Sequence, residues 1–146
     1  MGKWNKVLFI VLAVALVASI GGIVYLTVMP KEDEKFTEFY ILGAEGKAEG
    51  YPEQAVVGEP VEVILGVVNH EYRLASYRVK IAIDNVDSKE IDIGILAHGE
   101  RWQRRVSFTP QVAREGQRVE FYLFRDGEDR PYFEEPLRLY IDVLSP

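Results

Sequence analysis

Residues 77–84 read YRVKIAID, and this stretch decides the fold of most of the chain. Its odd-numbered residues, from Tyr77 to Ile83, are apolar, whereas Arg78 and Lys80 lie between them. Because successive side chains of a strand point to opposite faces of a sheet, this alternation predicts a strand with one face in a core and one in water.

The same signal recurs on both sides of this stretch. Ile91, Ile93 and Ile95 alternate with polar residues or glycine, and residues 137–143 repeat the pattern. Two other segments, residues 61–68 and 119–124, are apolar on both faces, which is typical of central strands. The strands that we predict are residues 36–42, 61–68, 77–84, 90–95, 102–108, 119–124 and 137–143.

About seven short strands in about 110 residues predict an all-β fold, an immunoglobulin/fibronectin-like β-sandwich. Asp84-Asn85 and Asp126-Gly127 predict hairpin turns. Residues 43–60 are the longest irregular stretch, which is either a functional loop or a crossover lying on the sheet. The chain has no cysteine, which excludes disulfides, thiolate metal sites and thiol nucleophiles.

The N-terminus differs sharply from the rest of the chain. Residues 7–29 read VLFIVLAVALVASIGGIVYLTVM without a charge, and such a helix spans about 34 Å, enough to cross a bilayer. Lys3 and Lys6 precede it, which predicts a cytoplasmic N-terminus. We therefore predict a single-pass signal-anchor protein with a cytoplasmic segment (1–6), a transmembrane helix (7–29), a linker (30–35) and an extracytoplasmic β domain (36–146).

A cleaved signal peptide is the main alternative, because the apolar run contains small-residue sequences that signal peptidase accepts. The length of the run favours an uncleaved anchor in the cell membrane. Within it, Ala15 and Ser19, and Ala18 and Gly22, are spaced four apart and would allow close approach of another helix. The alternative is that small residues are simply common in membrane helices.

Charge limits the classes of partner. After Met29 the chain has 15 basic and 23 acidic residues, so its balance is 15 − 23 = −8. This balance argues against nucleic acid as a partner. The partners that we expect are the lipid bilayer and other membrane-protein subunits, and no cofactor is expected.

Three places carry candidate interaction residues: Asn69, His70 and Glu71 at the end of an apolar strand, Tyr51 in the long irregular stretch, and Trp102 with Arg104 in a basic, aromatic cluster. The alternative for the first group is a turn in which polar side chains satisfy backbone groups. The alternative for Trp102 is a core position flanked by outward-facing arginines.

Metal and catalytic chemistry have little support in the sequence. His98 and His70 are the two histidines and lack metal-ligand spacing, and the acidic groups at 32–34 and 126–129 lack the pattern of a calcium loop. Ser76 and Ser107 have no nucleophile-elbow glycines around them. We expect no metal and no enzymatic activity.

The residues from Phe36 to Gly43, then Glu45-Gly46-Lys47-Ala48, Tyr51-Pro52, Gly58 and the run from Gly66 to Tyr72 resemble a known family. This family is called domain of unknown function 1616, and it occurs in archaeal and bacterial membrane proteins. The resemblance implies a membrane-attached outer β domain and no known activity. Members often have Pro where this chain has Ala44, and many carry several membrane helices where one is predicted here.

These observations favour a non-enzymatic, membrane-tethered interaction module, an accessory subunit of a membrane or cell-envelope complex. The alternative is a stand-alone extracytoplasmic domain that binds a ligand or polysaccharide through the loops around residues 46–52, His70 and Trp102.

Overall fold

A computed structural model describes residues 3–28 and 34–146, and within the helix it describes the side chains of residues 3–19. The chain divides into two compact units, Met1–Asp33 and Glu34–Pro146. Each unit is described by itself.

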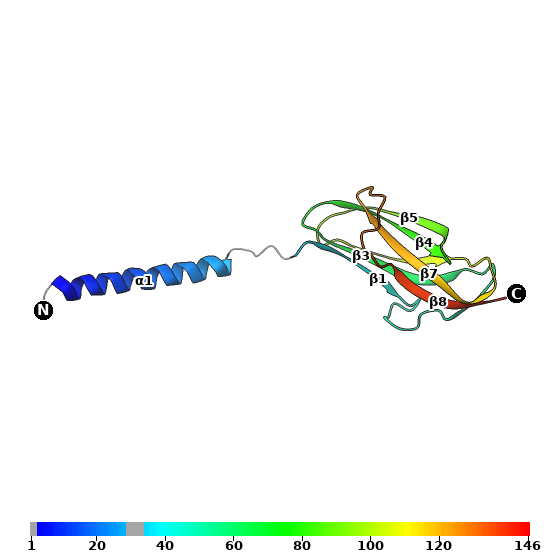
Figure 1. Cartoon of the computed structure of the whole chain (residues 1–146), viewed down its shortest axis with the longest axis horizontal. Coiled ribbons are helices and arrows are strands. Elements are labelled where there is room, and N and C mark those ends of the chain that lie inside the picture. Colours follow the sequence, from blue (N-terminus) through cyan, green and yellow to red (C-terminus); the bar gives the residue numbers. More distant parts are fainter. Residues whose placement is uncertain (1–2, 29–33) are drawn as a thin grey trace. The chain divides into compact units, whose positions relative to one another are not determined.

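The first unit contains one α-helix, α1, which runs from Lys3 to Val28 (Figure 1). The helical conformation expected for the apolar run is therefore present. Ser19 donates a hydrogen bond from Oγ to the carbonyl oxygen of Ala15 at 2.9 Å. Ala18 and Gly22 also lie in α1, although the surroundings of Gly22 are outside the described side chains.

Among the residues that the structure describes, no helix is both long enough and apolar enough to cross a membrane. The predicted end of the span at Met29 and most of the predicted linker, residues 30–33, lie outside the described residues.

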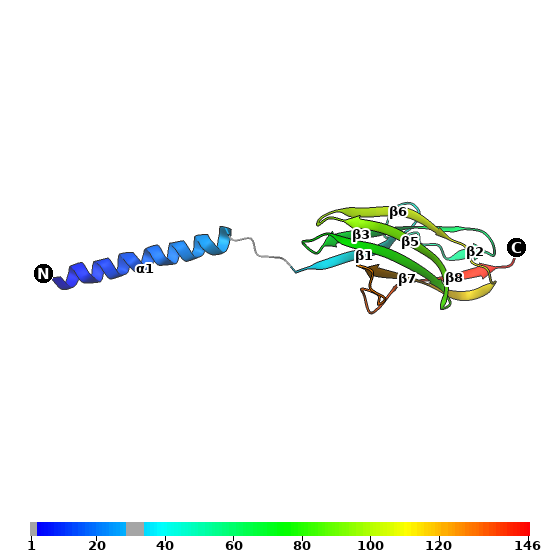
Figure 2. The ribbon, with the colours of Figure 1, turned by 90° about the horizontal axis from the view of Figure 1, so that it is seen from above.

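The second unit is a sandwich of two sheets (Figures 1 and 2). One sheet has the strand order β1-β3-β6, and the other has the order β2-β8-β7-β4-β5. The strands are β1 Phe36–Leu42, β2 Gln54–Val56, β3 Val61–His70, β4 Ala75–Ile83, β5 Val86–Leu96, β6 Arg101–Phe108, β7 Arg114–Arg125 and β8 Leu137–Leu144.

The all-β sandwich prediction is confirmed, and the two segments predicted as central strands lie inside their sheets. β3 lies between β1 and β6, and β7 lies between β8 and β4. Their inward side chains, such as Val63 and Phe121, are fully buried. Burial of this apolar layer between the sheets is the main source of stability in a chain without disulfides.

Both predicted turns are present, and one of them is a tight hairpin. Asp84 and Asn85 have φ values of 48° and 67° and join β4 directly to β5, and positive φ at both central residues matches the twist of the flanking strands. Asp126 and Gly127 have φ values of 53° and 69° and form a turn after β7, but β8 does not begin until Leu137.

The long irregular stretch is a crossover that carries a strand missed in the sequence. β2 pairs in parallel with β8, so that Ala55 lies opposite Val143. A three-residue strand is too short to produce a recognisable alternation, which is why the described residues form eight strands where about seven were expected.

The inward face predicted for Ile91, Ile93 and Ile95 is wrong in part. Ile91 and Ile93 pack against the core, but Ile95 is 68% exposed and Leu96 is buried in its place. The register of β4 and β5 shifts between the pairs Tyr77–Gly94 and Arg78–Asp92, and Gly94 has φ 88°. This β-bulge moves the next residues to the opposite faces.

Candidate functional site

One end of the β domain gathers the residues that the sequence singled out around position 70. We call it the entry end, because β1 begins there: it comprises Phe36, the turn at residues 69–74 and the loop at residues 97–100. In the pairing of β1 with β3, Phe36 lies opposite His70. The loops from both sheets therefore meet at this end.

Asn69 is fully buried and holds the turn at the entry end. Its Nδ2 donates to the carbonyl oxygens of Arg73 and Leu96, each at 2.8 Å, and its Oδ1 accepts from the backbone N–H of Glu71 at 2.7 Å. All of these contacts satisfy backbone groups, as the turn interpretation expected.

Glu71 is a buried carboxylate at the centre of a polar network. Its Oε2 accepts hydrogen bonds from Thr37 Oγ1 at 2.9 Å, Tyr132 OH at 3.0 Å and Arg125 Nη1 at 2.6 Å. Thr37 Oγ1 also lies 2.8 Å from Tyr77 OH. The network joins strands of both sheets, because Thr37 is on β1 whereas Tyr77 and Arg125 are on β4 and β7.

The network also sets the charge state of Glu71. Burial raises the pKa of this carboxyl, but the hydrogen bonds from Thr37 and Tyr132 and the positive charge of Arg125 favour the ionised form. The net result is a pKa below the ordinary value of 4.5. The network therefore favours the ionised form of Glu71.

A row of aromatic rings covers the entry end. Phe36 stacks on His70 with 4.6 Å between ring centroids, and Tyr72 stacks on His98 at 4.1 Å. The two histidine rings meet edge to face at 6.4 Å. His98 Nδ1 accepts a hydrogen bond from the backbone N–H of Tyr72, which fixes the second stack.

Three apolar side chains remain open to solvent beside this row. Phe36 is 44% exposed, Tyr72 is 42% exposed and Leu74 is 66% exposed. We use the name aromatic row for Phe36, His70, His98 and Tyr72. The entry end thus presents an apolar surface on a turn that is fixed from beneath by buried hydrogen bonds.

The other predicted interaction residues do not share one site. Trp102 packs against the core on β6, and the Arg104 guanidinium lies 5.9 Å from its ring centroid. Tyr51 donates a hydrogen bond from OH to the carbonyl oxygen of Ile41 at 3.1 Å. Because Ile41 is at the far end of β1 from Phe36, Tyr51 and His70 belong to opposite ends of the domain.

The described part of the chain contains no group of three or more His, Asp or Glu residues arranged to hold a metal ion. The acidic residues 32 and 33 lie outside the described residues. In the other acidic group, Asp126 accepts hydrogen bonds from Arg73 Nη2 at 2.6 Å and from the backbone N–H of Ser76. These contacts lower the pKa of Asp126, with the Arg73 hydrogen bond as the largest cause.

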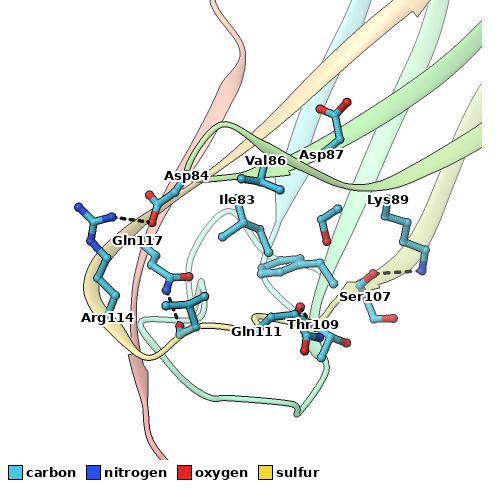
Figure 3. A pocket seen from close by; sticks show the side chains of 13 residues that line it. Ile83, Asp84, Val86, Asp87, Lys89, Ser107, Thr109, Gln111, Arg114 and Gln117 are labelled. Atoms are coloured by element: carbon cyan, nitrogen blue, oxygen red, sulfur yellow. Dashed lines mark hydrogen bonds and ion pairs between the residues drawn. The ribbon is translucent and has the colours of Figure 1, made fainter.

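A second candidate site, which the sequence did not reveal, lies between the open edges of the two sheets. β5 is an edge of one sheet and β6 is an edge of the other, and the two strands run beside each other (Figure 2). Between them is a pocket of about 570 Å³. We call it the β5–β6 pocket; its lining includes Ile83, Val86, Lys89, Phe108, Val112 and Gln117 (Figure 3).

The local geometry of three elements opens this pocket. A register shift between the pairs Ile81–Lys89 and Ala82–Asp87 leaves an extra residue on β5 and bends its first half. Phe108 meets Phe121 edge to face, with 6.1 Å between centroids, and separates the pocket from the core. The loop from β6 to β7 supplies the remaining wall.

Gln117 is the one polar side chain of the pocket that is buried like a core residue, at 1% exposure. It lies in phase with Val119, Phe121 and Leu123, the inward positions of β7. The signal in the sequence for this pocket was a glutamine at a position of β7 where the alternation predicts an inward-facing apolar residue. The other lining residues come from separate strands and loops, so no sequence spacing marks them.

Solved structures share the fold at low identity. The CARDB domain of the PF1109 protein from Pyrococcus furiosus, in complex with di-metal ions, has a TM-score of 0.53 and 19% identity over 78% of this chain and 99% of that chain. A β-glucosidase from Listeria innocua in complex with glucose has a TM-score of 0.52 and 13% identity over 76% of this chain and 16% of that chain. These likenesses show the fold.

No curated protein matches the chain. The model of one family, described as a domain of unknown function (DUF1616), matches residues 30–143. That match covers most of the chain, including β1 to β7 and β8 up to Val143, and it agrees with the resemblance seen in the sequence from Phe36 to Tyr72. The chain therefore belongs to the DUF1616 family.

Proposed function

We propose that this protein is a non-enzymatic, membrane-tethered module whose outer β domain binds other subunits of a membrane or cell-envelope complex. In this proposal residues 7–29 anchor the chain and its N-terminus is cytoplasmic. The absence of charge from Val7 to Met29, with Lys3 and Lys6 before it, supports the anchor and its orientation.

The observation that carries the proposal is the apolar surface of the entry end. Phe36, Tyr72 and Leu74 are exposed, yet the turn below them is fixed by Asn69 and Glu71. A rigid, partly apolar surface loses little conformational entropy when a partner binds, and aromatic residues are enriched in protein interfaces. This combination favours the interpretation that the entry end binds a protein partner over the interpretation that its loops only connect strands.

The position of this surface in the chain supports a membrane partner. In the sequence, seven residues, 29–35, separate the end of α1 from Phe36. A membrane anchor would tether the β domain by its entry end. The subunits that such a surface meets first would themselves be membrane proteins.

The carboxylates with shifted pKa values support a non-enzymatic role. Glu71 and Asp126 are both paired with arginines, and both hold turns in place. A catalytic acid or base needs a carboxyl that is free to exchange protons with a substrate. These two groups are committed to the fold.

The test is purification of the tagged full-length chain from its own membranes in mild detergent, followed by mass spectrometry of stoichiometric partners. Replacing Tyr72 and Leu74 by serine should remove these partners. Replacing Tyr140 and Leu144 by serine is the matched control, because both side chains are exposed on β8, away from the entry end.

A constant set of partners that is lost only in the Tyr72/Leu74 variant would support the proposal. Recovery of the chain alone, or equal loss in both double variants, would overturn it. The sequence-based alternative is a domain that binds a ligand through the loops around residues 46–52, His70 and Trp102. The β5–β6 pocket is lined by none of these residues.

A further inference from the structure

The β5–β6 pocket contains a buried hydrogen-bond acceptor without a partner. Gln117 Nε2 donates to the carbonyl oxygen of Val112, but Gln117 Oε1 has no hydrogen-bond partner among the residues that the structure describes. Figure 3 shows the Gln117 side chain among those that line the pocket, with a dashed line from its amide nitrogen for this hydrogen bond. A buried acceptor of this kind is costly unless something donates to it.

The mouth of the pocket carries one cation that lacks a carboxylate partner. Asp84 pairs with Arg114 at 3.4 Å, and Asp87 pairs with Lys80 at 3.5 Å. Lys89 instead donates from Nζ to the carbonyl oxygen of Ser107 at 3.1 Å, and in the described part of the chain it forms no ion pair. The charge of Lys89 is therefore available to an anionic group.

Apolar side chains lie between these two polar points. Ile83 and Phe108 form the inner wall, and Val86 and Val112 are exposed beside the opening. Most of the residues that line the pocket are polar or charged, and these four apolar side chains form its apolar wall. A concave site that combines an apolar wall with convergent polar groups can bind a small ligand. The volume of about 570 Å³ is in the range of such sites.

The edges that border the pocket are poorly suited to an added peptide strand. β5 has two register shifts and carries Asp87 and Lys89 at the pocket, and β6 carries Arg104 and Arg105. Bulges and charges on edge strands prevent pairing with another strand. These features favour a small molecule as the occupant.

We propose that the β5–β6 pocket binds a small amphiphilic acid: a compact apolar body with a hydroxyl at its inner end and an anionic group at the mouth. The hydroxyl donates to Gln117 Oε1. The anionic group pairs with Lys89 and displaces its bond to Ser107. The inference is independent of the anchor and of the entry end.

The probe is 3-(4-hydroxyphenyl)propionate, tested against the purified full chain by isothermal titration calorimetry, with the same buffer without the chain as the blank. Two matched compounds remove one feature each: 3-phenylpropionate lacks the hydroxyl, and 4-ethylphenol lacks the anionic group. The hydroxylated acid should bind about tenfold more tightly than 3-phenylpropionate, because only the former satisfies the buried acceptor. It should also bind more tightly than 4-ethylphenol.

Two variants assign these preferences to residues. Gln117→Met should abolish the preference for the hydroxyl while 3-phenylpropionate still binds. Lys89→Met should abolish the preference for the acid over 4-ethylphenol, and it tests the proposal even if Gln117→Met fails to fold. Lys47→Met, at an exposed loop position, makes the same change of charge and should alter nothing.

Equal binding of all three compounds, or preferences that survive Gln117→Met and Lys89→Met, would overturn the proposal, as would no binding. The NMR signals of the Val86 and Val112 methyl groups report where the ligand binds. They should shift when the hydroxylated acid binds. Shifts confined to residues of the entry end would also contradict the proposal.

Discussion

Glu71 and Arg125 form an ion pair of 2.6 Å that connects the two sheets of the sandwich. Glu71 follows β3 in one sheet, and Arg125 ends β7 in the other. Thr37 and Tyr77 extend the same link between β1 and β4. The loops of the entry end are therefore held by a polar connection that crosses the core layer.

Glu71→Gln should destabilise the protein strongly, because it leaves the Arg125 guanidinium without its buried carboxylate. Removal of one partner of a buried ion pair costs about 3 kcal/mol. The expected fall in Tm is roughly 10 °C for a domain of this size. Thermal unfolding followed by circular dichroism measures it. Glu38→Gln is the control: Glu38 pairs with His70 at an exposed site, so its loss should change stability by about 0.5 kcal/mol or less.

The contribution of Glu71 should depend on pH in a defined direction. Its pKa is lower in the folded protein than its ordinary value of 4.5, so the stabilisation is fully present above that value and is lost as the pH falls through the folded pKa. The difference in Tm between the unmodified chain and Glu71→Gln should be constant from neutral pH down to about pH 5. It should then shrink on further acidification. A difference that grows in acid would contradict the assignment.

Asn69→Asp should weaken the turn at residues 69–74 through contacts other than those of Glu71. The amide of Asn69 donates to two carbonyl oxygens, at Arg73 and Leu96, and a carboxylate there would face them without a proton to donate. The expected cost is about 2–3 kcal/mol. Protease cleavage within residues 70–74 should become faster. Asn85→Asp is a matched control, because Asn85 Oδ1 already accepts from Arg118 and a carboxylate keeps that bond.

Most of the β-sandwich was predictable, because it depends on alternation that can be read in the sequence. The inward faces of residues 77–83 and 137–143 follow directly from period-two patterns. The face of Ile95 was not predictable, since a single bulge at Asp92–Gly94 reversed it. Bulges depend on the pairing partner, which the sequence of one strand does not contain.

The residues of the candidate sites were also predictable only in part. Asn69, His70 and Glu71 are adjacent in sequence, so they could be selected as a group. Their main contacts, Thr37 and Arg125, are distant in sequence and depend on how the two sheets are stacked. Gln117 was not predicted as a site residue, because the pocket that it lines is formed together with residues of β5 and β6.

Gly43→Ala should destabilise the loop that follows β1. A Cβ at this position would lie 2.3 Å from the backbone oxygen of Glu49, so the backbone itself must move. The expected cost is about 1–3 kcal/mol, measured by thermal unfolding. Gly66→Ala is a useful comparison: its Cβ would meet the end of the Tyr40 ring, which can swing towards solvent, so the cost should be smaller.

The last prediction concerns α1, where Ala15, Ala18, Ser19 and Gly22 supply small residues along one side of the helix. If this side packs against a second helix, Ala18→Leu should reduce association, because close approach of helices requires small side chains. Ala13→Leu adds the same side chain about 140° away around the helix, and it should have no effect. Energy transfer between labelled copies of the chain in lipid vesicles measures self-association, and co-purification measures association with other subunits. A loss of association in Ala18→Leu alone would identify the packing side. Equal behaviour of the two variants would mean that the small residues reflect only the composition of an apolar helix.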